Sequence, residues 1–271
     1  REPMLRQQAN SYIEGLPLQP FHDEQAHAWV RELEAKAHLV QEEFKQVIAG
    51  DELQRRGNNV WIGLADNRDA GTEAYGPEWR TLGLQDRGLW DAVNTQIFPE
   101  TTALLHSSGT PCVEAFFAKM PAGSSINAHS DGCNFHLTCH LGVDVPEGEC
   151  WIQVGDQRRE WRNGRVMLFD TSVMHAAAND AAVDRYILML RVWHPALTPE
   201  EIVALEWIFS CLDEPHLLEP YLPPPTPTVA TSLTVGRKGS ADGGAVADGS
   251  RAERRAAEKA AKKAAKKARA R

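Results

Sequence analysis

Hydrophobic residues near the start of the chain recur at the spacing of a helix. Between residues 23 and 49 the apolar positions step by three and four, which places them on one face. Asp23 is a suitable N-cap, and Gly50 is a suitable C-terminal stop. The pattern therefore predicts one amphipathic helix over residues 23–49.

Two later segments also have helical spacing, residues 88–106 and residues 198–213. The stretch between the first two helices, residues 51–84, is polar and rich in glycine. Trp61 and Trp79 are its expected anchors, because large aromatic side chains bury well. We expect the last helix to close the fold.

From residue 111 the spacing of apolar residues changes to two. This alternation is typical of strands with one buried face, and Gly, Asp, Asn and Pro separate the alternating segments. The predicted strands cover residues 112–119, 134–143, 149–155, 158–162, 165–170 and 185–193. Many short strands after a helical start predict a mainly β fold, an antiparallel barrel or sandwich with flanking helices.

The charge is distributed unevenly along the 271 residues, whose formal net charge is −8. Residues 251–271 carry ten basic and two acidic side chains, and the rest of the chain carries 19 basic and 35 acidic ones. An acidic body is a poor general nucleic-acid binder, so no specific nucleic-acid partner is expected. No stretch approaches the ~20 apolar residues of a membrane span, which predicts a soluble protein without a transmembrane segment.

The composition predicts five parts. Residues 1–20 form an N-terminal extension, and residues 21–110 a helical and loop region packed on the barrel. Residues 111–221 form the barrel with its closing helix. Residues 222–250 are a Pro/Gly-rich disordered linker, and residues 251–271 a basic Ala/Lys-rich tail. The tail is expected to be solvated and partly helical, with acidic partners or membrane surfaces as the alternative.

Cysteine usage gives an expectation about compartment. Five cysteines are an odd number, and none has C-x-x-C spacing, which argues against a disulfide scaffold and a zinc ribbon. We expect free thiols in a reducing compartment such as the cytoplasm or an organelle matrix. The chain begins with Arg1 rather than Met, which leaves a targeting segment upstream open.

An H-x-D triplet carries the first sign of chemistry. In an extended segment residues i and i+2 point to the same side, so His129 and Asp131 converge. With one distant histidine they make the facial triad of non-heme Fe(II), which leaves three coordination positions open. His175, after the predicted strand 165–170, is the candidate third ligand. The alternative for the triplet alone is a surface turn.

The last predicted strand, residues 185–193, places two arginines on a mostly apolar face. A buried guanidinium requires an anion, which a bidentate carboxylate would supply to Arg185. The alternative for Arg185 is a salt bridge with Asp184 or Glu114. Arg191 lies on the same face and is a further pocket candidate.

The predicted strand over residues 134–143 directs polar side chains into the lumen. His136, Thr138 and His140 alternate with apolar residues, so they share one face. His140 is either a co-substrate contact or a satisfied core histidine, and His136 either a substrate contact or part of the lumen packing. Asn134, at the start of the strand, is another pocket candidate.

Three stretches of the chain resemble the aspartyl/asparaginyl β-hydroxylase family. They read PAGSSINAHSDGCNFHLTCHLGV, FDTSVMHAAAND and DRYILMLRVWHPALTPEE, and the similarity extends over roughly residues 20–210. These hydroxylases are Fe(II)- and 2-oxoglutarate-dependent oxygenases on a double-stranded β-helix, a cupin-like jelly-roll barrel. The resemblance implies this fold, with Fe(II), 2-oxoglutarate and O2 as cofactor and co-substrates. It also implies hydroxylation of an unactivated C–H bond in a peptidyl Asp or Asn, or in a related substrate.

Carried over residue by residue, the resemblance makes His129 and His175 iron ligands. Arg185 becomes the partner of the distal 2-oxoglutarate carboxylate, and His140 a further contact of the co-substrate. Thr138 stands at a co-substrate position of the same strand.

The chain departs from the animal peptide hydroxylase at several of these positions. Asp131 stands where that enzyme has a glycine, which here completes the triad. Thr138 and His136 stand where it has arginines, one for 2-oxoglutarate and one for its acidic substrate, and Ala118 replaces a serine that touches the co-substrate. Oxygenase chemistry is therefore expected, whereas an aspartyl or asparaginyl substrate is not fixed. The alternatives are hydroxylation or desaturation of a small molecule, and a cupin-like binding protein without turnover.

Overall fold

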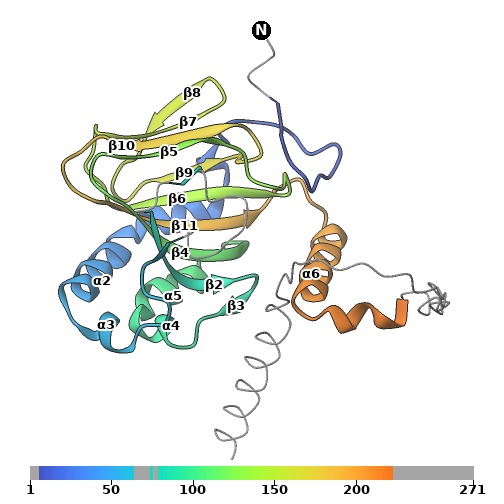
Figure 1. Ribbon diagram of the computed structural model, residues 1–271, viewed down its shortest axis with the longest axis horizontal. Coiled ribbons are helices and arrows are strands. Elements are labelled where there is room, and N and C mark those ends of the chain that lie inside the picture. Colours follow the sequence, from blue (N-terminus) through green and yellow to red (C-terminus); the bar gives the residue numbers. More distant parts are fainter. Residues whose placement is uncertain (1–5, 64–73, 76–78, 222–271) are drawn as a thin grey trace, which may run out of the picture. The chain divides into compact units, whose positions relative to one another are not determined.

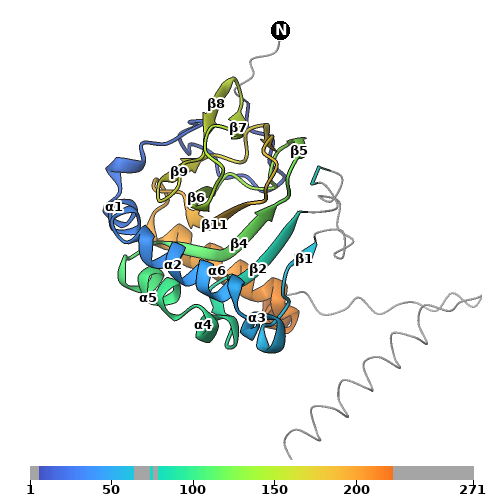
Figure 2. The same cartoon turned by 90° about the vertical axis from the view of Figure 1, so that its left-hand side faces the viewer.

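The computed structural model describes residues 6–63, 74–75 and 79–221 (Figure 1). Two β-sheets face each other, and helices cover the outer face of the larger sheet, as Figure 2 shows from the side. The predicted mainly β fold with flanking helices is confirmed. The predicted linker and basic tail, residues 222–250 and 251–271, lie outside the described residues.

The larger sheet has seven strands in the order β1-β2-β4-β11-β6-β9, with β3 paired to β2. Its strands are β1 (Ile62–Gly63), β2 (Arg80–Asp86), β3 (Leu89–Trp90), β4 (Cys112–Met120), β6 (His136–Asp144), β9 (Val166–Phe169) and β11 (Arg185–Trp193). The smaller sheet has the order β5-β10-β7-β8, and its strands are β5 (Ser124–His129), β7 (Cys150–Val154), β8 (Gln157–Glu160) and β10 (His175–Asn179).

From β4 onward the chain passes back and forth between the two sheets. Strands β4, β6, β9 and β11 belong to the larger sheet, and β5, β7, β8 and β10 to the smaller one. Each pairing between these strands is antiparallel. Two four-stranded layers filled alternately by one chain form the double-stranded β-helix, so the predicted jelly-roll barrel is present.

The helices are η1 (Glu24–Ala26), α1 (Ala28–Ala35), α2 (Ala37–Ala49), α3 (Glu52–Arg56), α4 (Asn94–Ile97), α5 (Pro99–Ser107), α6 (Pro199–Asp213) and η3 (Pro215–Tyr221). The prediction of one helix over residues 23–49 is therefore wrong. Asp23 caps only the short η1, and the chain breaks again at Lys36, where φ is −110° and ψ is 12°. The apolar spacing continues across this break, because Leu33 and Ala37 are both buried against the sheet, so the pattern gave no sign of it.

The segment 88–106 also differs from its prediction, since it begins with β3 and turns helical only at Asn94. Strands β2, β5 and β10 were not predicted. β5 reads SSINAH and β10 reads HAAAN, and neither shows a clear alternation of large apolar and polar residues.

Strand β11 separates two parts of the core. Leu188 and Leu190 pack with the helix-covered layer, whereas Ile187 and Met189 face the space between the sheets. This is the predicted alternation. Complete burial of a leucine contributes about 1.5–3 kcal/mol, so the central strand is firmly held and provides a rigid floor for side chains that point inward.

The ends of the described chain pack against this barrel. Asn134 accepts a hydrogen bond from the Ile13 N–H (2.8 Å) and donates one to the Ile13 carbonyl (2.9 Å), which fixes the N-terminal segment. Helix α6 begins with a capping box between Thr198 and Glu201.

All five cysteines are free thiols. Within the described part of the chain, no helix is both long and apolar enough to cross a membrane.

Candidate active site

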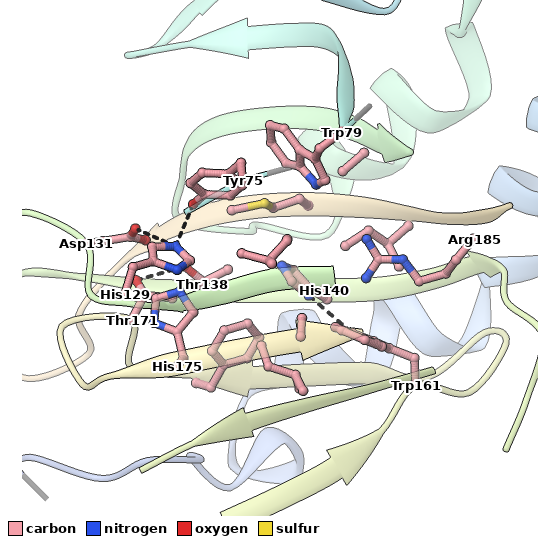
Figure 3. Close-up of a pocket in the computed structure, with 17 residues that line it drawn as sticks. Tyr75, Trp79, His129, Asp131, Thr138, His140, Trp161, Thr171, His175 and Arg185 are labelled. Carbon is pink, nitrogen blue, oxygen red and sulfur yellow. Dashed lines mark hydrogen bonds and ion pairs between the residues drawn. The ribbon is translucent and has the colours of Figure 1, made fainter. Parts of the chain in front are cut away.

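Three predicted ligand residues meet between the sheets. His129 ends β5 and His175 begins β10, and the two are direct cross-strand partners whose ring centroids lie 4.2 Å apart. Asp131 follows two residues after His129, and its backbone N–H donates to the Thr171 carbonyl (2.7 Å). The potential ligand atoms of the three side chains all lie within 4.8 Å of one another. Figure 3 shows them grouped at one end of a pocket.

Both histidines direct Nε2 toward the place where the three potential ligand side chains meet. Nδ1 of His129 lies 2.8 Å from the Asn127 carbonyl, and Nδ1 of His175 lies 2.9 Å from the Val173 carbonyl. A carbonyl only accepts, so each Nδ1 carries the hydrogen, and Nε2 of the neutral ring is left with a lone pair. Burial lowers the pKa of His175 to about 4, which keeps this ring neutral near pH 7. Such backbone-oriented imidazoles are typical of metal ligands.

Asp131 completes the donor set as an anion. Its Oδ2 pairs with Nη1 of Arg191 (2.7 Å), and its Oδ1 lies 3.9 Å from Nε2 of His129. Burial opposes the charged form, but the charge of Arg191 and the hydrogen bonds from Arg191 and Thr171 outweigh it and lower the pKa of Asp131. Two neutral imidazoles and one carboxylate are the ligands of the non-heme Fe(II) facial triad, so the residues present fit that ion.

Arg191, a predicted pocket residue, is engaged by two carboxylates. Besides Asp131 on Nη1, its Nε lies 3.5 Å from Oε2 of Glu114. Nη1 is also within 3.4 Å of the Thr138 hydroxyl and 3.3 Å of the Thr171 hydroxyl. Burial would lower the pKa of Arg191, but the two carboxylates raise it. Its charge is thus directed at Asp131 and at Glu114.

The opposite end of the pocket holds a cation without a counter-charge. Arg185 is 2% exposed, and its guanidinium lies 4.4 Å from the centroid of the Trp161 ring. Its Nε has no hydrogen-bond partner among the residues that the structure describes. The alternative pairing with Asp184 or Glu114 is wrong, because both of these carboxylates pair with other cations. Burial lowers the pKa of Arg185 to about 10, so the group stays charged near pH 7. No carboxylate of the described residues balances it, which leaves this end suited to an anion.

His140 lies between the two ends of the pocket (Figure 3). Trp161 donates from Nε1 to Nδ1 of His140 (3.1 Å), and an indole nitrogen is a donor only, so Nε2 of His140 carries the hydrogen. That N–H is buried, and no described residue accepts a hydrogen bond from it. Burial, followed by the charge of Arg185, holds the pKa of His140 well below its usual range. The side chain therefore offers a neutral donor beside Arg185.

The remaining predicted residues divide into two groups. Thr138 lines the pocket, with its hydroxyl 3.2 Å from that of Thr171, and Ala118 lines it too. His136 and Asn134 do not line it. His136 is surrounded by Phe135, Trp193 and Phe209, and Asn134 holds the N-terminal segment as described above.

Two aromatic residues of the pocket, Tyr75 and Trp161, were not predicted from the sequence. The Tyr75 hydroxyl lies 2.9 Å from Nε2 of His129, and the Tyr75 ring packs between His129 and Trp79, at 4.7 and 4.9 Å. Trp161 supplies both the surface under Arg185 and the hydrogen bond to His140. Neither has a spacing signal, because Tyr75 lies in a Gly-rich stretch and Trp161 follows the short strand β8.

Comparisons with known proteins identify the family of the chain. The model of a family described as aspartyl/asparaginyl beta-hydroxylase matches residues 34–195, more than half of the chain. Human aspartate beta-hydroxylase domain-containing protein 2 is 33% identical over 142 residues, which cover 49% of this chain and 38% of the human protein. Mouse aspartyl/asparaginyl beta-hydroxylase is 32% identical over 128 residues, which cover 46% of this chain and 17% of the mouse protein.

Among solved structures, an oxidoreductase of the 2OG-Fe(II) oxygenase family from Burkholderia pseudomallei aligns with a TM-score of 0.34 and 13% identity, over 52% of this chain and 75% of that one. The chain spans less than half the length of the curated relatives named above. The family model, in contrast, includes both histidines, Asp131 and Arg185 within its matched range. The chain belongs to the aspartyl/asparaginyl β-hydroxylase family.

Proposed function

We propose that the protein is an Fe(II)- and 2-oxoglutarate-dependent dioxygenase that hydroxylates an unactivated C–H bond. The observation that carries the proposal is the pocket itself. One end has the donor set His129, Asp131 and His175, and the other end has the uncompensated Arg185. A metal site facing a buried cation suits a co-substrate with a chelating group at one end and a carboxylate at the other.

In this proposal Nε2 of His129, Nε2 of His175 and Oδ1 of Asp131 hold the iron. When bound, the metal supplies the oxidising power that converts substrate C–H, O2 and 2-oxoglutarate to alcohol, succinate and CO2. The chain's own contribution begins with orientation, since both histidine rings are fixed by backbone carbonyls. The Tyr75 hydroxyl donates a hydrogen bond to Nε2 of His129, and this bond would have to break before the same nitrogen could bind the metal.

Arg185 and His140 would hold 2-oxoglutarate. The guanidinium of Arg185 pairs with the distal carboxylate, and the free Nε2–H of His140 donates to the bound molecule. Both groups are kept in place by Trp161, which lies under one and donates to the other. The other pocket walls include the apolar side chains of Ile126, Ile152 and Phe169, which exclude water from the reacting groups.

The test measures succinate formation by the Fe(II)-loaded chain together with 2-oxoglutarate affinity from calorimetry. Arg185→Ala should weaken 2-oxoglutarate binding about 30-fold or more, since losing one partner of a buried charge pair costs about 2 kcal/mol or more. His175→Ala should abolish succinate formation and iron retention. Arg158→Ala is the matched control, because Arg158 also lies over a tryptophan ring, that of Trp151, but on the smaller sheet outside the pocket.

Wild-type 2-oxoglutarate affinity in Arg185→Ala would contradict the co-substrate assignment. Iron binding without succinate formation, with any substrate offered, would instead favour a cupin-like binding protein.

A further inference from the structure

A second cavity, which we call the side groove, opens beside the metal pocket. It has a volume of about 590 Å³, and Tyr75, Trp79 and Met189 line both cavities. Its floor is formed by inward-facing residues of β2, β4 and β11, and its far wall by residues of the segments 58–62 and 89–94. The volume lies within the range of sites that bury drug-sized ligands, well beyond the needs of one free amino acid.

The strand pairing makes the two cavities one continuous surface. Gly83 of β2 pairs with Phe116 of β4, Phe116 with Met189 of β11, and Met189 with His140 of β6. This row crosses the sheet from the side groove to the 2-oxoglutarate end of the metal pocket. At Gly83 the floor lacks a side chain, and a Cβ built there would meet nothing within 4 Å. A molecule reaching the metal from this side would therefore cross an open floor.

The charges around the side groove are mainly negative. Among its described lining residues, Asp86, Asp91 and Glu114 are acidic and Arg191 is the one cation. Asp86 pairs with the neighbouring Arg87 (3.3 Å), so the uncompensated charge of the wall is that of Asp91. Arg191 is shared between Glu114 and Asp131, so it is not available to a carboxylate of the substrate.

Asp91 lacks a compensating cation within the described part of the chain. Its carboxylate accepts from Nδ2 of Asn58 (2.7 Å) and from the backbone N–H groups of Val93 and Asn94 (2.9 and 2.7 Å). These neutral donors hold the charge in place without balancing it, and the wall of the side groove stays negative.

Gln85 adds an independent sign of a ligand. It lines the side groove from β2, is 8% exposed, and its Oε1 is buried without a hydrogen-bond partner among the described residues. A buried acceptor without a donor is unfavourable. An N–H group of a bound molecule would remove that cost.

We infer that the side groove binds the part of the substrate that flanks the hydroxylated carbon, and that this part is a peptide segment with a basic side chain. The inference rests on the proposed function and names the substrate class of the same site. The acidic wall at Asp91 and the acceptor at Gln85 suit ammonium, guanidinium and amide N–H groups, whereas an acidic segment would meet like charge.

The experiment compares three N-acetylated hexapeptide amides with asparagine in the centre, flanked by two lysines, two glutamines or two glutamates. Calorimetry at low salt measures their binding to the full chain loaded with Fe(II) and N-oxalylglycine, without O2. The lysine peptide should bind about tenfold or more tightly than the glutamate peptide, with the glutamine peptide between them, and added salt should narrow the difference.

Variants locate the binding surface. Gly83→Leu fills the floor and should weaken the lysine peptide about tenfold or more, whereas Gly83→Ala should bind it nearly as wild type. Asp91→Asn, which retains an acceptor for the N–H groups at 93 and 94, should reduce the preference for lysine. Asp156→Asn removes an exposed charge between β7 and β8 and should leave the preference unchanged.

Equal affinity for the three peptides, tighter binding of the glutamate peptide, or wild-type binding by Gly83→Leu would overturn the inference. Free lysine amide that binds as tightly as the lysine peptide would overturn the assignment to a peptide. These titrations need no turnover, so their failure is distinct from a chain that forms no succinate.

Discussion

The pair between Asp131 and Arg191 allows a prediction about metal-free stability. Replacing Arg191 by methionine keeps an unbranched chain of similar length but leaves Asp131 and Glu114 without their shared cation. At 2.7 Å, and with an effective dielectric constant of about 20, the attraction to Asp131 alone is about 6 kcal/mol. Desolvation of both groups offsets part of this attraction. We expect Arg191→Met to lower the free energy of unfolding by about 3–5 kcal/mol, the usual cost of leaving a buried charge unpaired.

Urea unfolding in the presence of a chelator measures this quantity. A double-mutant cycle with Asp131→Asn should return a coupling free energy of about 2–3 kcal/mol, because removing both partners avoids the unpaired charge. Arg165→Met is the control, since Arg165 pairs with Glu34 at 3.0 Å but is 61% exposed, and its loss should cost less than about 1 kcal/mol. If Arg191→Met were no more destabilising than Arg165→Met, the pair would have no structural role and the reasoning would be refuted.

Four further outcomes follow from the same structure. Arg191→Met should also weaken Fe(II) binding about 10–100-fold in a metal titration, because Arg191 orients a ligand. Tyr75→Phe should raise Fe(II) affinity about fivefold, since it removes the hydroxyl that occupies Nε2 of His129; a lower affinity would contradict this role. Gly142→Ala should destabilise strongly, because its Cβ would clash with the Arg162 carbonyl oxygen, and thermal unfolding would show this. Burial, and then the charge of Arg191, lowers the pKa of His136 to about 3 in the folded chain. Between pH 6.5 and 3, therefore, this imidazole is protonated only in the unfolded chain, and the free energy of unfolding falls as the pH falls. Urea unfolding at pH 7 and pH 5 should show His136→Leu losing about 2 kcal/mol less than wild type, and equal losses would contradict it.

Periodicity predicted an element correctly where the apolar residues within that element alone have a clear spacing. Strand β6 alternates polar with apolar residues, and β11 is a long apolar segment whose two arginines share one face; the structure places both strands near the centre of the larger sheet. Strands β5 and β10 carry the histidines but were not predicted, because their polar and alanine residues give no period of two. The break at Lys36 was equally hidden, since the apolar positions of α1 and α2 keep helical spacing across it.

The candidate site was predictable as far as local geometry reaches. His129 and Asp131 converge because they are two residues apart in an extended segment, and His175 was suggested by a motif. The partners of Arg191 were not predictable. Its pairing depends on the loop after β5 approaching β11, a contact between residues distant in sequence. Tyr75 lies in a sequence segment without periodicity, so only the three-dimensional structure shows its contact with His129.

The carboxylate at position 131 and the arginine at position 191 have to be understood together. A buried anion is stable in the absence of metal only if a cation lies beside it, and Arg191 is that cation for Asp131. Once its guanidinium is engaged there and on Glu114, it cannot also select an acidic substrate. Thr138 and His136, which stand where the animal peptide hydroxylase has arginines, add no positive charge near pH 7, because Thr138 is neutral and burial keeps His136 neutral. In the proposed function, the same ion pair therefore holds Asp131 beside the two histidines and occupies the Arg191 guanidinium, so we do not expect Arg191 to select an acidic substrate.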